Sequence, residues 1–426
     1  MKTARHTYLQ AERGMAARHD VAHCDNVFTI IYRPAIHIFT TFLSKGCMIC
    51  FLLLMLCTTS CREDELVVPA EYDPVPAAPD SEGRIRGLYL LNEGNMGSNK
   101  CTLDYLDYVT GLYARNIYPE RNPNVIKELG DVGNDIAIYG SKLYLVVNCS
   151  HKVEVLDART AVRIAQIDIP NCRYIKFHRG KAYVSSYVGP VLIDPDAPKG
   201  AVCEIDTTTL KVTRRVTVGY QPEEMEIIDD YMYVANSGGY RAPNYDNTVS
   251  VIQLIDFKQV RQIPVAINLH RVRKDRYGRL WVTSRGDYNS IPPRLYYLER
   301  DDATGEMRVA GQLDIAVSDL AIFDDSMYYV GVAWSNYTGT NTISYGIVNI
   351  RDRQRVADNF ITDGSERNIK MPYGITVHPV TGDIYVTDAK NYVSSGTLYC
   401  FSPDGKQQWS VRTGDIPAHI CFLENK

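Results

Sequence analysis

The chain has 426 residues, and its 46 Lys and Arg against 50 Asp and Glu give a formal net charge of −4. Because the charge is nearly balanced and no basic block with interleaved aromatic residues occurs, we do not expect nucleic acid as a partner. The unusual count is that of tyrosine, with 30 residues against 10 Phe and 3 Trp. Tyrosine suits both half-buried strands and binding loops, so its position along the chain has to decide between them.

An apolar run of ten residues lies at 48–57. It is too short to span a bilayer and is typical of the apolar part of a signal peptide, with a buried core helix as the alternative. The residues Thr58-Thr59-Ser60-Cys61 follow it and resemble a bacterial lipobox, in which the cysteine receives a lipid. We therefore expect a signal-peptide region over 1–60 and lipidation of Cys61. The length of 1–44 indicates a start codon assigned too far upstream.

The residues after Cys61 predict where the protein is held. Arg62-Glu63-Asp64-Glu65 resembles the surface-export signal of Bacteroidetes lipoproteins, although four charged residues can also simply open a solvated tether. Four prolines among small and acidic residues follow up to Gly83, so we expect a lipidated flexible tether over 61–83. The prediction is an outer-membrane lipoprotein that faces the cell exterior and contacts the membrane through its lipid alone.

One phrase recurs from Gly87 onward: an aromatic residue, then aliphatic residues, then a small polar residue. Examples are Leu88-Tyr89-Leu90-Leu91-Asn92 and Met232-Tyr233-Val234-Ala235-Asn236. The aromatic residues of the seven copies lie 39 to 56 residues apart and are Tyr89, Tyr144, Tyr183, Tyr233, Trp281, Tyr329 and Tyr385. Seven copies at this period indicate propeller blades of four short strands each.

The other strands of each unit can be placed around this phrase. An alternating apolar stretch precedes it, as at 371–377, and a strand that ends in Asp and a tight turn follows it, as at 204–209. Both patterns indicate antiparallel strands. The C-terminal stretch 416–422 has the pattern of a first strand, whereas the first unit begins with its second strand. We therefore predict an all-β domain over 84–426, a seven-bladed β-propeller closed by the C-terminal strand, which completes the first blade and removes an open edge.

The loop lengths predict which face of the propeller binds a ligand. Loops between second and third strands share one face with the connections between blades, and here they are long and rich in Tyr, Trp, Asn and Arg. Such a face suits a large planar ligand with polar edges. The first residues of the inner strands would add a polar floor, with solvated residues around a channel as the alternative. The candidate ligand-binding residues are Asn92, Asn95, Asp135, Tyr187, Glu223, Asn236, Tyr240, Tyr245, Arg271, Arg285, Tyr288, Asp319, Trp334, Tyr337, Tyr373, Asp388 and Tyr392.

The repeated Tyr-Val-x-Asn phrases, the opening 88–95 and the lipobox resemble the YncE-like, surface-layer-type seven-bladed propeller lipoproteins of Bacteroidetes. The resemblance extends over roughly residues 84–426. Within that group the chain is similar to BtuG-type propellers, surface lipoproteins that capture cobalamin for a TonB-dependent outer-membrane transporter. The resemblance implies a corrinoid as bound cargo and such a transporter as partner, and no prosthetic group is expected.

Two other functions stay open beside capture of a small molecule. A metal-dependent lactonase would need acid and amide groups around a cation, for which Glu223, Asn268, His270 and Asp319 are the candidates. Since no HExxH, P-loop or Gly-x-Ser-x-Gly elbow occurs, we expect neither an enzyme nor a resident metal. The other alternative is a surface scaffold that docks a protein or a glycan.

The cysteines of the exported part allow one specific prediction. Besides Cys61 they are Cys101, Cys149, Cys172, Cys203, Cys400 and Cys421. Disulfides are common in exported proteins, and Cys149 and Cys172 are both expected toward the loop-rich face. We therefore predict this pair, with buried thiols as the alternative.

Overall fold

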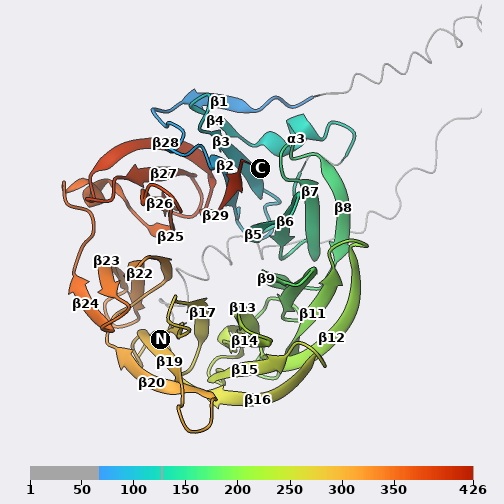
Figure 1. The fold of residues 1–426 in the computed structure, drawn as a ribbon, viewed down its shortest axis with the longest axis vertical. Helices are drawn as coiled ribbons and strands as arrows, with labels where there is room; N and C mark the ends of the chain where they lie inside the picture. The colour runs from blue at the N-terminus through green and yellow to red at the C-terminus, as the bar shows by residue number, and fades with distance from the viewer. Residues whose placement is uncertain (1–66, 126–127, 426) are drawn as a thin grey trace, which may run out of the picture. The chain divides into compact units, whose positions relative to one another are not determined.

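The computed structural model describes residues 67–125 and 128–425, and its strands form seven sheets around one axis (Figure 1). Each sheet contains four antiparallel strands, and the first sheet carries a fifth. The fold is a seven-bladed β-propeller, so the prediction from the repeated phrase is confirmed. None of the helices among the described residues is long and apolar enough to cross a membrane.

The strands form four concentric sets, and the first blade carries one extra outer strand, β1 (Glu71–Pro74). The inner strands are β29 (Pro417–Glu424), β5 (Gly133–Tyr139), β9 (Cys172–His178), β13 (Pro222–Ile228), β17 (Leu269–Lys274), β21 (Asp319–Phe323) and β25 (Pro372–Val377). The second strands are β2 (Ile85–Asn92), β6 (Lys142–Val147), β10 (Lys181–Ser186), β14 (Tyr231–Asn236), β18 (Leu280–Ser284), β22 (Ser326–Ser335) and β26 (Ile384–Asp388). The third strands are β3 (Thr102–Asp107), β7 (Lys152–Asp157), β11 (Lys199–Asp206), β15 (Thr248–Gln253), β19 (Arg294–Arg300), β23 (Thr340–Asn349) and β27 (Ser395–Phe401). The outer strands are β4 (Leu112–Arg115), β8 (Arg163–Asp168), β12 (Lys211–Tyr220), β16 (Lys258–Pro264), β20 (Met307–Leu313), β24 (Gln354–Ala357) and β28 (Gln407–Asp415), and β1 (Glu71–Pro74) pairs with β4. Three short helices occur among the residues that the structure describes: α3 (Ile117–Arg121), η1 (Gly239–Arg241) and η2 (Ser365–Asn368).

The repeated phrase forms the second strand of every blade, and its aromatic residue fills the interface with the next blade. Tyr144 of the second blade, for example, packs with Ile175 and Val184 of the third blade and is fully buried. In each blade this aromatic residue can be located by the residue opposite it on the inner strand. Ala137 lies opposite Tyr144 in the second blade. Burial of a large ring at each interface supplies much of the apolar area that holds the ring of blades together.

The sixth blade corrects one assignment made from the sequence. Tyr328, not Tyr329, pairs with Ala321 of the inner strand, and so occupies the position that Tyr144 holds in the second blade. Tyr328 packs against the sixth and seventh blades, whereas Tyr329 packs against the fifth. Because Tyr328 and Tyr329 are neighbours on a strand, they point to opposite faces of the sheet. Only the register distinguishes them.

The C-terminal strand closes the ring as predicted. β29 pairs with β2 over the length of both strands, and Leu88 lies opposite Phe422 and Leu90 opposite Ile420. The innermost strand of the first blade therefore comes from the end of the chain, and it covers the edge of β2 that would otherwise be open to pairing with another molecule.

The N-terminal segment is more ordered than a free tether. Glu71–Pro74, which lie within the predicted 61–83 tether, form β1 on the outer edge of the first blade. Arg115 of β4 makes ion pairs with Glu71 and Asp73 of β1. The described chain is thus attached to the propeller from β1 onward. The predicted signal-peptide region and the lipidation site Cys61 lie outside the described residues.

The predicted disulfide between Cys149 and Cys172 is not formed. The thiol of Cys172 is buried between the second and third blades, where it donates to the carbonyl oxygens of Lys152 at 3.2 Å and Val147 at 3.5 Å. Burial raises the pKa of Cys172 to about 12. The thiol of Cys149 instead donates to Oδ1 of Asn148 at 3.4 Å and lines a cavity on the axis. The two thiols therefore contact different groups. Cys172 packs as a buried thiol and does not form a disulfide.

Three acidic side chains of inner strands join neighbouring blades, and we call these contacts the axial latches. In each latch a carboxylate accepts a hydrogen bond from a backbone N–H of the next inner strand. The bonds are Ile175 N to Asp135 Oδ2 (2.9 Å), Val272 N to Glu224 Oε2 (3.1 Å) and Ile375 N to Asp319 Oδ2 (3.2 Å). Asp319 also lies 3.1 Å from Nε of Arg271, and both side chains are almost fully buried.

The latch at Asp319 predicts a stability change. Asp319→Ala should lower the free energy of unfolding by about 3–5 kcal/mol, because it leaves the buried guanidinium of Arg271 without its carboxylate. Urea denaturation followed by circular dichroism measures the loss. Asp302→Ala, on an exposed turn of the fifth blade, is the control and should leave the midpoint unchanged. Equal midpoints for both variants and the parent protein would show that the latch contributes nothing.

Candidate ligand-binding cavity

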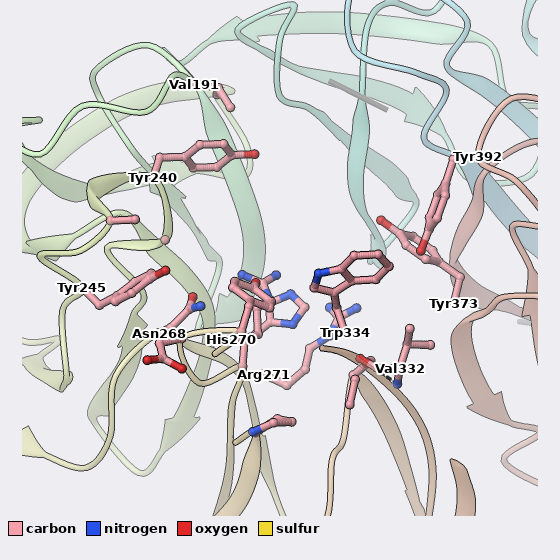
Figure 2. Close-up of a pocket in the computed structure, with 18 of the residues that line it drawn as sticks. Val191, Tyr240, Tyr245, Asn268, His270, Arg271, Val332, Trp334, Tyr373 and Tyr392 are labelled. Carbon is pink, nitrogen blue, oxygen red and sulfur yellow. Dashed lines mark hydrogen bonds between the residues drawn. The ribbon is translucent and has the colours of Figure 1, made fainter. Parts of the chain in front are cut away.

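A cavity of about 620 Å³ opens on one face of the propeller and is lined by residues from all seven blades. Its volume lies in the range of about 300–1,000 Å³ that small-molecule sites occupy. Tyr174 lines its floor, and six further aromatic side chains form its wall, namely Tyr240, Tyr245, Tyr288, Trp334, Tyr373 and Tyr392. Figure 2 shows Trp334 and His270 near the middle, with Tyr240 and Tyr245 on one side and Tyr373 and Tyr392 on the other.

The aromatic wall comes mainly from the loops that were predicted to carry it. Tyr240 lies in η1, between β14 and β15, Tyr288 lies between β18 and β19, and Tyr392 lies between β26 and β27. Trp334 lies near the end of β22, and its indole Nε1 donates to Oδ1 of Asn336 at 3.1 Å. The loop-rich face and the cavity face are therefore the same.

The residue before an inner strand holds the loop of its own blade in place. Oε1 of Gln221 accepts a hydrogen bond from the backbone N–H of Tyr240 at 2.7 Å. Nδ2 of Asn268 donates to the carbonyl oxygen of Gly286 at 3.0 Å. That bond fixes the orientation of the Asn268 amide, and its Oδ1 is buried without a hydrogen-bond partner among the described residues. The hydrogen bonds of Gln221 and Asn268 therefore hold these two loops in place.

Two of the wall tyrosines have a strained backbone. Tyr288 has φ of 62° and Tyr392 has φ of 64°, a region that costs a non-glycine residue about 1–2 kcal/mol. Their loops hold them there: Oδ1 of Asp287 accepts from Ile291 N at 2.8 Å, and Oδ1 of Asn391 accepts from Ser394 N at 2.8 Å. Strain of this kind is concentrated at binding and catalytic sites, where it sets the direction of a side chain.

The floor of the cavity consists of charged and polar residues that begin the inner strands. Arg173 of β9 donates from Nη2 and Nε to Oε2 of Glu223 at 2.9 and 3.2 Å, and Tyr187 donates to Oε1 of Glu223 at 2.6 Å. Nη1 of Arg285 lies 3.4 Å from the same carboxylate. Burial would raise the pKa of Glu223, but Arg173 and then Arg285 outweigh it and hold this pKa below its ordinary value. Glu223 is therefore ionised and fixes both guanidinium groups.

Burial and neighbouring charges keep His270 neutral. Burial and then Arg285, Arg271 and Arg173 hold the pKa of His270 well below its ordinary value, so the imidazole is neutral. Nη1 of Arg271 donates to the hydroxyl oxygen of Tyr174 at 3.3 Å, and this hydroxyl lies 2.9 Å from Nε2 of His270. Because a hydroxyl group can accept two hydrogen bonds and donate one, the Tyr174–His270 bond forms with either tautomer of the ring.

The small polar residues that end the repeated phrase help to shape this floor. Oγ of Ser185 accepts from Tyr174 N at 3.1 Å, and Oγ1 of Thr283 accepts from Arg271 N at 2.9 Å. Both bonds span positions where the register between inner and second strand shifts. Such irregularities re-aim side chains, and here the side chains concerned reach the cavity.

Nine of the predicted ligand-binding residues line the cavity: Asn95, Tyr240, Tyr245, Arg271, Arg285, Tyr288, Trp334, Tyr373 and Tyr392. Two others, Asp135 and Asp319, line a second cavity of about 200 Å³ formed by later residues of the inner strands. Tyr187 and Glu223 lie behind Arg173, and Tyr337 is 81% exposed and outside both cavities.

Three predicted residues at phrase ends are buried away from both cavities. Nδ2 of Asn92 donates to Thr102 Oγ1 at 3.0 Å, Nδ2 of Asn236 donates to Ser250 Oγ at 2.9 Å, and Oδ1 of Asp388 accepts from Met371 N at 2.8 Å. Their polar groups therefore form hydrogen bonds within the blades. The four residues considered for a lactonase do not surround one point. Glu223 and Asp319 pair with different arginines, and Asp319 lines the second cavity.

The prediction missed Arg173 and Tyr174. They begin β9 at the positions that Glu223 and Glu224 hold in β13 and His270 and Arg271 hold in β17. Alignment of the inner strands on Cys172 would have found them. Met96, Val191 and Ile193, which add apolar lining, lie in long loops where no sequence pattern marks the direction of a side chain.

Comparison with solved structures shows the fold alone. A functionally unknown protein from Desulfotomaculum acetoxidans is 9% identical, with a TM-score of 0.56 over 80% of this chain and 100% of its own. A hypothetical selenium-binding protein from Sulfolobus tokodaii is 10% identical, with a TM-score of 0.53 over 80% of this chain and 94% of its own. A quinonprotein alcohol dehydrogenase-like protein from Bacteroides thetaiotaomicron is 15% identical, with a TM-score of 0.51 over 79% of this chain and 78% of its own.

No curated protein sequence matches the chain. A family profile does match, over residues 86–411 and thus nearly all of the propeller. The chain belongs to the DUF5074 family, which is described as a domain of unknown function.

Proposed function

We propose that this protein binds an organic ligand in the cavity of the loop-rich face and releases it unchanged. The observation that carries the proposal is the aromatic wall, six rings from four neighbouring blades around one cavity. Rings of this kind supply large contact area at low entropic cost, while a few fixed polar groups orient the ligand. The arginines of the floor are such groups.

The ligand we propose first is a corrinoid. Its macrocycle is broad and nearly flat and carries amide groups around its edge, which suits aromatic rings above a floor of hydrogen-bond donors. The resemblance of the sequence to the cobalamin-capturing BtuG-type propellers supports the same choice by analogy. We propose further that a TonB-dependent outer-membrane transporter receives the ligand from the propeller.

Replacement of the wall should abolish this binding. Tyr240→Ala, Tyr288→Ala and Trp334→Ala combined should weaken cyanocobalamin binding about a thousandfold, because each aromatic anchor contributes on the order of 1–2 kcal/mol. Isothermal titration calorimetry measures the affinity, with the mature chain from residue 61 carrying Cys61→Ser so that it remains in solution. Tyr337→Ala is the matched control, since Tyr337 is exposed on the same loop set and lines neither cavity.

Two results would contradict the proposal. If the triple variant keeps the affinity of the parent protein, the aromatic wall is not the site. If the parent protein releases no heat with cyanocobalamin while circular dichroism shows that it is folded, the corrinoid is the wrong ligand. A glycan or a protein then takes its place on the same face.

We propose that the protein is attached to the outer membrane by a lipid on Cys61 and faces the cell exterior. In cells, Cys61→Ser should move the protein from the membrane fraction to the soluble fraction, because the lipid has no other attachment point. Immunoblotting of the two fractions measures the shift. Cys57→Ser, four residues earlier in the apolar run, is the control and should leave the protein with the membrane. Retention of the Cys61→Ser protein in the membrane fraction would exclude this anchor.

A further inference from the structure

The cavity floor presents donors, because the carboxylates around it are already satisfied. The acidic residues that line the cavity are Glu93 and Asp287. Oε2 of Glu93 accepts from the hydroxyl of Tyr373 at 2.8 Å, and its Oε1 lies 3.5 Å from Nε2 of His419. Asp287 accepts the backbone N–H groups of Asn289 and Ile291 in its own loop. Both carboxylates are therefore engaged in holding the protein itself.

The cationic residues of the floor are arranged differently. Both oxygens of Glu223 are taken up by Tyr187, Arg173 and Arg285, so this one carboxylate lies behind two guanidinium groups. The side chains of Arg173 and Arg285 are 13% and 20% exposed and line the cavity. Arginine stays charged in any such site. The floor beside Glu223 thus turns positive charge toward the ligand space.

His270 adds a neutral hydrogen-bonding group to this part of the floor. It lines the cavity, and burial together with Arg285, Arg271 and Arg173 holds its pKa well below the ordinary value, so the ring is neutral. Its Nε2 lies 2.9 Å from the hydroxyl of Tyr174. A neutral histidine beside guanidinium groups adds polarity to the site without adding another positive charge.

We propose that the floor beside Arg173, Arg285 and His270 is a subsite for a singly charged anionic group of the ligand, a carboxylate or a phosphodiester. This inference rests on the proposed function, since it uses the same cavity. Guanidinium groups that are fixed by a carboxylate behind them are preorganised to bind such a group through paired N–H donors. An amide of the same shape would offer these guanidinium groups no opposite charge. The subsite therefore selects for charge.

Two probes of matched shape test the subsite. In fluorine NMR titrations of the mature chain with Cys61→Ser, 4-fluorobenzoate should bind about ten- to a hundredfold more tightly than 4-fluorobenzamide, the ratio expected for hydrogen bonds to a charged group. The ring resonances of His270 should shift with benzoate and saturate at the same concentration. These readouts do not depend on cyanocobalamin.

Three variants locate the preference. Arg173→Gln should bring the affinities for the two probes together, whereas Arg173→Lys should keep benzoate ahead because it keeps the charge and the pair with Glu223. Arg241→Gln is the matched control. Arg241 belongs to the same loop-rich face, donates to the carbonyl oxygen of Asn244 at 3.0 Å and stacks on Tyr220, but does not line the cavity.

The subsite is wrong if both probes bind the parent protein equally, if neither binds in the millimolar range, or if Arg173→Gln melts normally and retains the preference. If Arg173→Gln does not fold, the lysine variant decides, because loss of the preference there would also exclude a charge-selective site. Failure of cyanocobalamin to bind while benzoate is preferred would overturn the corrinoid and leave the subsite in place. The reverse result would overturn the subsite alone.

Discussion

The rest of the structure depends on one constraint, that each sheet is apolar on both faces and needs a neighbour on each side. A ring satisfies this for every sheet at once, provided that the first and last blades also meet. β29 provides the inner strand of the first blade from the far end of the chain. Across the same junction the hydroxyl groups of Tyr108 and Tyr385 lie 2.8 Å apart although the residues are 277 positions apart. Closure therefore turns seven marginal sheets into one cooperative unit.

Closure also creates the cavity. When the sheets meet around an axis, the starts of all seven inner strands converge, and side chains with no proximity in sequence become neighbours. The pairs of Arg173 with Glu223 and of Arg271 with Asp319 are buried at this convergence. Buried ion pairs add little net stability over apolar residues of similar volume, so stability alone does not account for these charges. Their position beside a cavity wall of six aromatic rings gives them a different use, the orientation of a ligand.

Much of the fold could be predicted from the sequence because the blade repeat is local. An aromatic residue followed by aliphatic residues marks a second strand wherever it occurs, and the incomplete first unit together with 416–422 revealed how the ring closes.

The site was harder to predict because it depends on register and direction. Tyr328 and Tyr329 differ only in which face of the strand they occupy, and the phrase ends Asn92, Asn236 and Asp388 look like binding residues until their strand partners are known. Arg173 and Tyr174 went unnoticed for the converse reason: their strand opens with an apolar cysteine, and only superposition of the inner strands shows their equivalence to His270 and Arg271.

The two parts of the cavity are built in different ways, and this difference bears on how a ligand would be held. The floor is made of strand residues whose guanidinium groups are fixed by Glu223 and Asp319, so its electrostatic field is set before any ligand arrives. The wall is made of loop residues, but these are also constrained, since Tyr288 and Tyr392 are kept in a strained conformation by side chains of their own turns. The conformational entropy and strain of ordering the site are thus met during folding. A ligand then loses little of its interaction energy to rearrangement of the protein, which is the condition under which aromatic contacts translate most fully into affinity.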